Sequence, residues 1–288
     1  MMRCWRSDGK TDNRFNDHEE LRYSLRSVAR YAPFVNHIYI ITMNQRPIWL
    51  ADHPKITIVD HAEIFRNLDD LPTFNSHALE SNIHRVPGLS EHFIYFNDDV
   101  FLGAPVQPEY FFVGDQLNVL FEKGLTPSGP PQENETVYRR ALRNMNAFLD
   151  EHFIGEPRQR LCHAPFALRK SYIEDFERKF PHIFAINSSH RFRSEHDYTL
   201  TNGLLQYYWK YQGKIVFHPL GNMMVSLRRD EFFERTAQRL QRLKEKRPAT
   251  FCLQDVMDNE SILTKALLHQ FLEGYYPEPA PWEKDHQV

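Results

Sequence analysis

One segment constrains the fold of this chain more than any other. The apolar and aromatic run 93–96 is followed directly by Asn97, Asp98 and Asp99. Such a run predicts a buried strand, and the carboxyl end of a buried strand is where open α/β sheets bind ligands. Two adjacent carboxylates also offer the hard oxygen donors that Mg²⁺ prefers beside a substrate phosphate. The alternative is a simple polar turn, because Asn and Asp are ordinary turn formers.

The segments that precede this strand alternate between helix and strand patterns. A helix is predicted to begin at Asp17 and to end before Pro33. Short buried strands are predicted at 37–42 and 56–59, and a helix at 78–84 leads into the strand at 93–96. Alternation of this kind indicates an open α/β sheet that is at least partly parallel.

The second half of the chain changes to helical periodicity. A loop rich in Pro and Gly at 125–135 is the best candidate for an internal boundary. Beyond it, apolar stripes with helical spacing predict core-facing helices around 138–149, 172–180, 204–211 and 262–271. Two short apolar runs predict further strands at 118–122 and 214–217.

Composition excludes several classes of protein. Over 288 residues, a hydrophobic fraction of 41% argues for a globular chain rather than disorder. A net charge of −3 gives no reason to expect nucleic acid as a partner. No apolar run approaches the roughly 20 residues of a membrane span, and the N-terminus has no signal-like segment. The odd, scattered cysteines Cys4, Cys162 and Cys252 indicate a reducing compartment, so an intracellular protein is expected.

Two other features have plain interpretations. The 15 histidines include no HExxH helix, and the chain has no Cys-x-x-Cys pair, so zinc is not expected. The basic stretch 235–247 is read as the solvated face of a helix. The alternative for this stretch is contact with an anionic membrane surface or a polyanionic product.

A first polar cluster lies before the strand at 93–96. His77, Glu80 and His84 have i, i+3 and i+7 spacing, which places them on one face of the predicted helix. That face is either catalytic or an ordinary histidine-bearing surface. Asn75 stands just before the helix, where it would serve as its N-cap or as part of a site.

Two later clusters add histidine, arginine and a further acid. His163 follows a loop, and His190 precedes Arg191 and Arg193 in the next polar segment. Paired guanidinium groups suit a phosphate clamp, since each holds phosphate oxygens through parallel hydrogen bonds; the alternative is a surface loop with ordinary salt bridges. Asp255 lies in the last cluster as a possible metal ligand, beside a competing helix cap. Together these groups describe a site for a metal-bound diphosphate.

Several of these segments closely resemble conserved blocks of the Stealth proteins. This family comprises hexose-1-phosphate transferases, among them bacterial capsule polymerases and the catalytic part of lysosomal-enzyme N-acetylglucosamine-1-phosphotransferase. The resemblance runs from about residue 14 to 255, with Gln254 where Asn is usual. The family's first block, a strand of the type Ile-Asp-Val-Val-Tyr-Thr-Trp-Val-Asp-Gly, is not visible upstream of the second. The segments that carry the resemblance are 20–27, 31–34, 71–76, 94–99, 163–165, 190–193 and 251–255.

The resemblance implies an α/β fold with a Rossmann-like sheet and a helical C-terminal part. We expect one catalytic domain over 1–288, with the sheet core at 14–124 and the mostly helical part at 125–288. The implied reaction transfers a sugar 1-phosphate, N-acetylhexosamine 1-phosphate in the first instance, from a UDP-sugar to a hydroxyl of an oligo- or polysaccharide and releases UMP. Mg²⁺ or Mn²⁺ would be the cofactor, and the location would be cytoplasmic, with peripheral contact at the inner face of the membrane as a further possibility.

Roles for single residues follow from the resemblance together with the chemistry of each side chain. The implied metal ligands are Asp98 and Asp99, helped by Asp255. The implied phosphate ligands are Arg191 and Arg193. His163 is the implied general base and His190 its alternative, because neutral imidazole suits proton removal near pH 7. The residues implied to position the donor are Arg22, Asn75, His77 and Asn97.

Two other functions stay open at this point. Carboxylates at a strand end also suit a metal-dependent glycosyltransferase, in which the acceptor attacks the sugar carbon and UDP leaves. Arginine and histidine in the third block favour phosphotransfer over this reaction. The remaining alternative is a non-catalytic protein that binds sugar nucleotides or glycans and lacks the first block.

Overall fold

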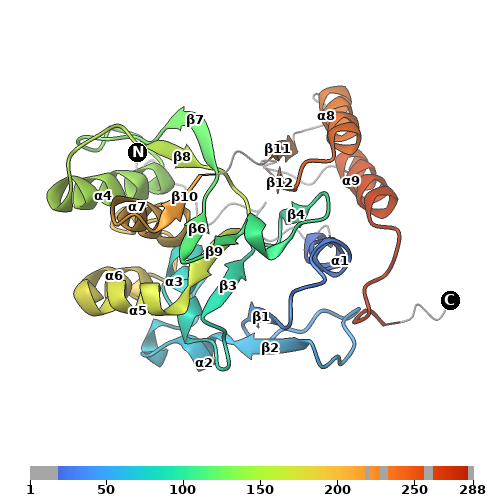
Figure 1. Ribbon diagram of the computed structural model, residues 1–288, viewed down its shortest axis with the longest axis horizontal. Helices are drawn as coiled ribbons and strands as arrows, with labels where there is room; N and C mark the ends of the chain where they lie inside the picture. Colours follow the sequence, from blue (N-terminus) through green and yellow to red (C-terminus); the bar gives the residue numbers. More distant parts are fainter. Residues whose placement is uncertain (1–18, 218–220, 228–232, 256–261, 285–288) are drawn as a thin grey trace, which may run out of the picture.

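The computed structural model describes residues 19–217, 221–227, 233–255 and 262–284. Within them, short sheets and helices surround one large hydrophobic core (Figure 1). Residues of this core come from both ends of the chain, from Tyr23 to Tyr276. The region predicted as sheet and the region predicted as helical therefore share the same interior.

Helices lie at or near most of the positions predicted. The first begins at Glu20, three residues after the predicted start at Asp17, which lies outside the described residues. Single turns of 3₁₀-helix occur at Leu68–Asp70, Ile83–Arg85 and Pro108–Tyr110, and a π-helical turn at Leu200–Leu204. The α-helices are α1 Glu20–Tyr31, α2 His61–Ile64, α3 Ser76–Glu80, α4 Val137–His152, α5 Lys170–Lys179, α6 Pro181–Ser189, α7 Leu205–Tyr211, α8 Phe233–Lys246 and α9 Ile262–Tyr275.

The strands are short. They are β1 Ile38–Thr42, β2 Ile56–Asp60, β3 His92–Tyr95, β4 Val100–Leu102, β5 Phe112–Val113, β6 Gln116–Asn118, β7 Phe121–Leu125, β8 Gln159–Leu161, β9 Phe166–Arg169, β10 Ile215–Val216, β11 Asn222–Leu227 and β12 Thr250–Asp255. Three pairs are parallel, namely β1 with β2, β6 with β10, and β11 with β12. The remaining pairs are antiparallel.

The α/β class predicted from the sequence is confirmed. The described strands nevertheless pair in sheets of two or three strands, so they do not clearly show the single Rossmann-like sheet that we expected. The polar triplet after β3 is one physical reason. It makes a turn closed by the Val100 N–H and the Asn97 carbonyl, 3.2 Å apart, and β3 and β4 on its two sides then pair with different partners. The strand at 93–96 is also half-buried rather than fully buried.

Two predicted elements are wrong in detail. The single strand expected at 118–122 is divided, because β6 ends and β7 begins within it and the two pair with different neighbours. The helix expected at 78–84 ends at Glu80. The side chains of Ser81 and Asn82 hydrogen-bond to the carbonyls of His77 and Ala78 at 2.7 and 2.8 Å, and such bonds compete with helix continuation.

Helix α1 holds β4 in place through two serine side chains. The Ser24 hydroxyl donates to the Val100 carbonyl at 2.7 Å, and the Leu102 N–H donates to the Ser27 hydroxyl at 3.0 Å. On the other edge, β4 pairs with β12. The strand that follows Asp99 is therefore hydrogen-bonded on both sides and fully buried.

The predicted basic helix is confirmed as α8, whose residues after Leu243 face solvent. In the described part of the chain, we find no helix of sufficient length and apolar character to cross a membrane.

Candidate active site

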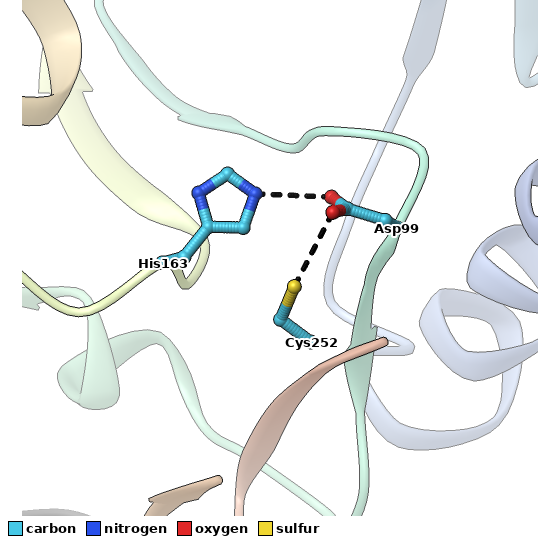
Figure 2. Close-up of side chains that lie close together, drawn as sticks. All are labelled: Asp99, His163 and Cys252. Atoms are coloured by element: carbon cyan, nitrogen blue, oxygen red, sulfur yellow. Dashed lines mark hydrogen bonds and ion pairs between the residues drawn. The ribbon is translucent and has the colours of Figure 1, made fainter. Parts of the chain in front are cut away.

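The registers of two antiparallel strand pairs bring distant side chains together. In the β3–β9 pair, Tyr95 lies opposite Phe166, so the residues after β3 meet the residues before β9. In the β4–β12 pair, Val100 lies opposite Cys252. Asp99 stands between these two pairs, and it therefore meets His163 from one side and Cys252 from the other (Figure 2).

We call the four residues at this point, Asn97, Asp99, His163 and Cys252, the Asp99 cluster. Asp99 Oδ1 lies 3.0 Å from His163 Nε2, and its Oδ2 accepts from the thiol of Cys252 at 3.3 Å. Asn97 Nδ2 lies 3.2 Å from the same imidazole nitrogen. Asp99 and His163 each leave 25% of the side chain exposed, whereas Cys252 is fully buried. The cluster therefore opens to solvent on its carboxylate and imidazole side.

Charges around His163 make it a stronger base than an ordinary histidine. Burial alone lowers the pKa of this imidazole, but the hydrogen bond and charge of Asp99 outweigh burial, and the charges of Glu80 and Asp98 add to them. The net pKa is raised. Because a carboxylate only accepts, Nε2 carries the proton shared with Asp99, and the neutral ring keeps its lone pair on Nδ1, on the far side of the ring (Figure 2).

The thiol of Cys252 is held in its neutral form. Burial raises its pKa far above the usual range, and the negative charge of Asp99 raises it further. In the protein alone, Cys252 therefore acts as a hydrogen-bond donor to Asp99 rather than as a nucleophile.

A second group of side chains surrounds the buried carboxylate of Asp197. Its Oδ2 lies 3.0 Å from Asn75 Nδ2 and 3.1 Å from His77 Nδ1, and its Oδ1 lies 2.7 Å from His190 Nδ1. The backbone N–H of Ser194 donates to Oδ2 at 3.0 Å. We call Asn75, His77, His190 and Asp197 the Asp197 cluster. It joins the predicted cluster at 71–84 to the arginine segment at 190–193.

These contacts fix the protonation of the Asp197 cluster. Burial alone would raise the pKa of Asp197, but the hydrogen bonds from His77, Ser194 and His190 outweigh it and lower the pKa. An ionised carboxylate accepts from both Nδ1 atoms, so each neutral imidazole keeps its lone pair on Nε2. His77 is buried, whereas His190 leaves 27% of its side chain exposed, so of these two histidines His190 is the one that solvent reaches.

The two predicted arginine ligands have different surroundings. Arg193 donates from Nη2 to the Ser76 hydroxyl at 2.9 Å, and its guanidinium lies 5.9 Å from the ring centre of Tyr138. Its Nε is buried and has no hydrogen-bond partner among the described residues. Arg191 is exposed, and among these residues its guanidinium has no hydrogen bond or ion pair; only its carbonyl is engaged, by Phe74 N–H at 2.7 Å. Of the two arginines, Arg193 is therefore the one whose guanidinium is fixed by contacts within the protein.

The charges of Asp99 and Arg193 both act on Tyr95 in β3. Burial raises the pKa of Tyr95, and the charges of Glu80, Asp98 and Asp99 raise it further while Arg193 lowers it. The phenol of Tyr95 is therefore close enough to feel the charges of Asp98 and Asp99. It also feels the charges of Glu80 in α3 and of Arg193. We therefore consider these groups together as one candidate site.

Glu80 also lies near the Asp99 cluster, although the sequence predicted no individual role for it. Its side chain is buried, accepts a hydrogen bond from the Thr201 hydroxyl, and raises the pKa of His163. Its position three residues after His77 was the only sequence signal. The third member of that predicted face, His84, does not join it. His84 lies on a separate 3₁₀ turn and contacts Glu177 Oε2 at 2.9 Å.

Three other predicted residues have structural contacts of their own. Arg22 is buried, and its Nε donates to Glu283 Oε2 at 2.7 Å. Asn75 caps α3, since its Oδ1 accepts from the His77 N–H at 3.1 Å while its Nδ2 is bound to Asp197. The exposed Asp98 accepts from the Asp99 N–H at 3.1 Å. Donor binding by Arg22, Asn75, His77 and Asn97 stays a prediction.

Hard oxygen donors for Mg²⁺ are present after β3. The carboxylate of Asp98 is exposed and that of Asp99 is partly exposed, and they are adjacent in the turn. This donor set fits the cation, which prefers carboxylate oxygens with several waters and substrate phosphate completing its shell. Asp255 lies at the end of β12, and its side chain is outside the described part of the structure. Its role as a third ligand also stays a prediction.

Comparison with known proteins identifies three conserved regions of one family along the chain. Models of the Stealth protein family match as conserved region 2 at residues 14–120, conserved region 3 at 162–210 and conserved region 4 at 241–288. Together they cover more than half of the chain. They contain every residue of the Asp99 and Asp197 clusters.

Curated relatives are similar over nearly the whole chain. An exopolysaccharide phosphotransferase of Streptomyces coelicolor is 39% identical over 96% of this chain and 47% of its own length. One of Nocardia farcinica is 36% identical over 95% of this chain and 54% of its own length. CpsY, an exopolysaccharide phosphotransferase of Mycobacterium tuberculosis, is 36% identical over 94% of this chain and 51% of its own length. The chain thus spans about half the length of these relatives.

Proposed function

The chain belongs to the Stealth protein family, and on this premise we propose that it transfers a sugar 1-phosphate to a glycan hydroxyl in capsule or surface polysaccharide synthesis. The donor would be a UDP-sugar, with UDP-N-acetylhexosamine as the first candidate, and the second product would be UMP. Relatives named exopolysaccharide phosphotransferases support the class of reaction. A cytoplasmic location, at the inner face of the membrane, is part of the same proposal.

Two residues support this proposal: His163, a base whose pKa is raised, and Arg193, an arginine fixed by its hydrogen bond to Ser76. Asp99 raises the pKa of His163, and Arg193 keeps an unpartnered, buried Nε within the same electrostatic neighbourhood. A base that removes a hydroxyl proton and a guanidinium that meets phosphoryl oxygens are two groups that recur in phosphoryl transfer.

In the proposed reaction, His163 Nδ1 removes the proton of the acceptor hydroxyl. The acceptor oxygen forms a bond to the phosphorus that carries the sugar, and the bond from that phosphorus to the bridging oxygen of the diphosphate breaks. UMP leaves with the bridging oxygen and its electron pair, and the proton stays on His163. Asp99 holds the ring in the required tautomer and stabilises the imidazolium that forms.

Charge on the transferred phosphoryl group is met by Arg193. One N–H of its Nη2 is bound to Ser76, so Nε, Nη1 and the second N–H of Nη2 are the donors available to phosphate oxygens. Asp98 and Asp99, with Asp255 as a further candidate, would hold Mg²⁺ or Mn²⁺, which neutralises the diphosphate when bound. His190 Nε2 is the alternative base if the acceptor enters from the side of the Asp197 cluster.

Part of the fold prediction also belongs to this proposal. We infer that β1 and β2, which are parallel, correspond to an edge of a Rossmann-like donor domain in the family, with the divided strand β3–β4 beside the diphosphate. We also infer that a sheet core at 14–124 is joined by a helical part at 125–288 that completes the site.

The leaving group tests the reaction class. Incubation with a panel of UDP-sugars, Mg²⁺ and capsule oligosaccharides is expected to release UMP and to give a product with the phosphorus-31 resonance of a diester. Stoichiometric UDP with a phosphorus-free glycan would instead establish attack at the sugar carbon, the glycosyltransferase alternative. Binding of UDP-sugars without turnover of any donor would support the non-catalytic alternative.

A His163→Gln variant tests the proposed general base. Glutamine cannot accept the proton, so turnover should fall by about a hundredfold or more, the usual contribution of a general base. His196→Gln is the matched control, because His196 is an exposed histidine near His190 with no part in the proposed proton transfer.

A further inference from the structure

Asp99, His163 and Cys252 combine three kinds of metal-binding atom at one point. A carboxylate oxygen, the imidazole nitrogen and the thiol sulfur all lie within 4.8 Å of one another. The three residues come from the turn after β3, the loop before β9 and the middle of β12 (Figure 2). The spacing rule that led us not to expect zinc concerns ligands close in sequence, and it cannot detect a set assembled from three distant segments of the chain.

The geometry is close to that of a tetrahedral ion. Zinc with bonds of about 2.0–2.3 Å separates its ligand atoms by about 3.4–3.6 Å. His163 Nε2 lies 3.0 Å from Oδ1 of Asp99, and Cys252 Sγ lies 3.3 Å from Oδ2 of the same carboxylate, so each lies slightly closer to one of the two oxygens than zinc ligands lie to each other. One carboxylate oxygen, the imidazole nitrogen and the sulfur all lie within 4.8 Å of one another, so side-chain adjustments of about 1 Å would admit the ion in place of the two hydrogen-bonding protons.

The ligand set also discriminates between cations. Mg²⁺ takes oxygen ligands, whereas thiolate and imidazole favour zinc and other late transition metals. Cys252 is fully buried, so its sulfur faces the interior of the cluster rather than solvent. Asp99 and His163 are partly exposed, which leaves a fourth position open to water or a phosphate oxygen.

We propose that Asp99, His163 and Cys252 form a zinc site and that zinc bound there inhibits the enzyme. The inhibitory part rests on the proposed function, because the ion would occupy the Asp99 carboxylate and the His163 imidazole that phosphotransfer uses. The binding part does not rest on it. Zinc and Mg²⁺ would then compete for Asp99, and the transferase would respond to the free zinc concentration.

The binding test uses cobalt and zinc alone, without substrate. Purified, metal-free protein titrated with Co²⁺ is expected to bind one equivalent and to show the near-ultraviolet charge-transfer absorption of a thiolate ligand. Zinc should displace the cobalt, and competition with a chromophoric chelator gives its affinity. Cys252→Ser should abolish the thiolate band and weaken zinc binding by at least about tenfold, since a soft ligand is lost.

Two controls keep this test decisive. Cys162→Ser removes the thiol next to His163 in the sequence. Cys162 is not one of the three proposed ligands, so this variant should keep the thiolate band and the zinc affinity unchanged. Cys4→Ser excludes the third thiol. Circular dichroism verifies that Cys252→Ser is folded, and Cys252→Ala serves as a second variant. A wild-type protein without the thiolate band, or a band that persists in both Cys252 variants, would overturn the site.

The inhibition test is separate. In Mg²⁺ buffer, added zinc should reduce UMP release by wild type, and a chelator that prefers zinc over magnesium should restore it. The Cys252→Ser variant should need at least about tenfold more zinc for the same fractional inhibition. Full activity of wild type with the site saturated would refute the inhibitory role. If no donor is turned over, the proposed function fails, and the cobalt titration still decides the zinc site.

Discussion

His190 Nδ1 lies 2.7 Å from Oδ1 of Asp197, a carboxylate with no exposed surface. The same carboxylate also accepts from His77, Asn75 and the Ser194 backbone. A single buried anion therefore fastens the segment around α3 to the segment that carries Arg193. The position of the arginine relative to the Asp99 cluster depends on this connection.

Replacing Asp197 with Asn should destabilise the protein. Asparagine offers one acceptor oxygen where four donors converge, and its amide group would face a donor, so we expect a loss of about 3 kcal/mol in the free energy of unfolding. Urea denaturation measures it. Asp52→Asn is the control, because Asp52 is 99% exposed and its ion pair with Arg46 should contribute less than about 1 kcal/mol. Equal stability of the two variants would mean that the Asp197 cluster does not organise the fold.

The same carboxylate predicts a pH dependence. Its pKa in the folded protein is lowered, so the unfolded chain binds the proton more readily. The stabilisation is fully present above the unfolded value of about 4, and it is lost as the pH falls through the folded pKa. The stability difference between wild type and Asp197→Asn should therefore be constant near neutral pH and should shrink below about pH 4. A difference that grows on acidification would contradict this assignment.

Lysine substitution should separate the two arginines. Arg193→Lys keeps the charge but loses both the Ser76 contact geometry and the buried Nε donor, so kcat should fall by about ten- to a hundredfold. Arg191→Lys replaces an exposed side chain and should have the smaller effect if the phosphate is held mainly by Arg193. Steady-state kinetics with both substrates varied gives the comparison. Normal kcat in both lysine variants would show that neither Arg191 nor Arg193 binds the phosphate through its guanidinium geometry.

The main parts of the candidate site could be proposed from the sequence because each has a local signal. The strand that ends in Asn97, Asp98 and Asp99 is an apolar run followed by acids, and the Arg193 segment is basic and flanked by histidine. What brings Cys252 to Asp99 is not local. It depends on the β4–β12 register, which pairs residues about 150 positions apart. No period or spacing rule contains that information.

The ends of helices and the partners of buried polar groups were also hard to predict, because they depend on contacts that the local sequence pattern does not contain. The stop of α3 at Glu80 depends on two short side chains that bond back to carbonyls. Asp197, on which the second cluster depends, looks in the sequence like one more acid in a polar loop. Arg22 stands in a segment that resembles a conserved block, yet its contacts are with Glu283 near the other end of the chain. Tertiary contacts decide each of these cases.

The contact of α1 with the C-terminal segment gives a stability prediction. Glu283 is buried and accepts from Arg22 at 2.7 Å and from Arg26 at 2.6 Å. Glu283→Gln removes the buried counter-ion that two guanidinium groups share and leaves them only the more exposed Glu19 and Glu273, so it should cost about 3 kcal/mol. Glu278→Gln, a nearby exposed substitution, should change stability by less than about 0.5 kcal/mol. Thermal and urea unfolding compare them, and a Glu283→Gln loss as small as the control's would show that the ion pair is dispensable.

The last prediction concerns Asp99 and the metal. Activity should disappear in EDTA and return with Mg²⁺ or Mn²⁺. Asp99→Asn preserves the volume of the side chain but removes the charge that both the cation and His163 require, so kcat should fall by about a hundredfold or more while the protein remains folded. Asp115→Asn, a substitution of an acid whose side chain is 92% exposed, should leave kcat unchanged. Full turnover in chelator would remove the metal from the reaction, and a near-normal rate for folded Asp99→Asn would place the catalytic centre elsewhere in the molecule.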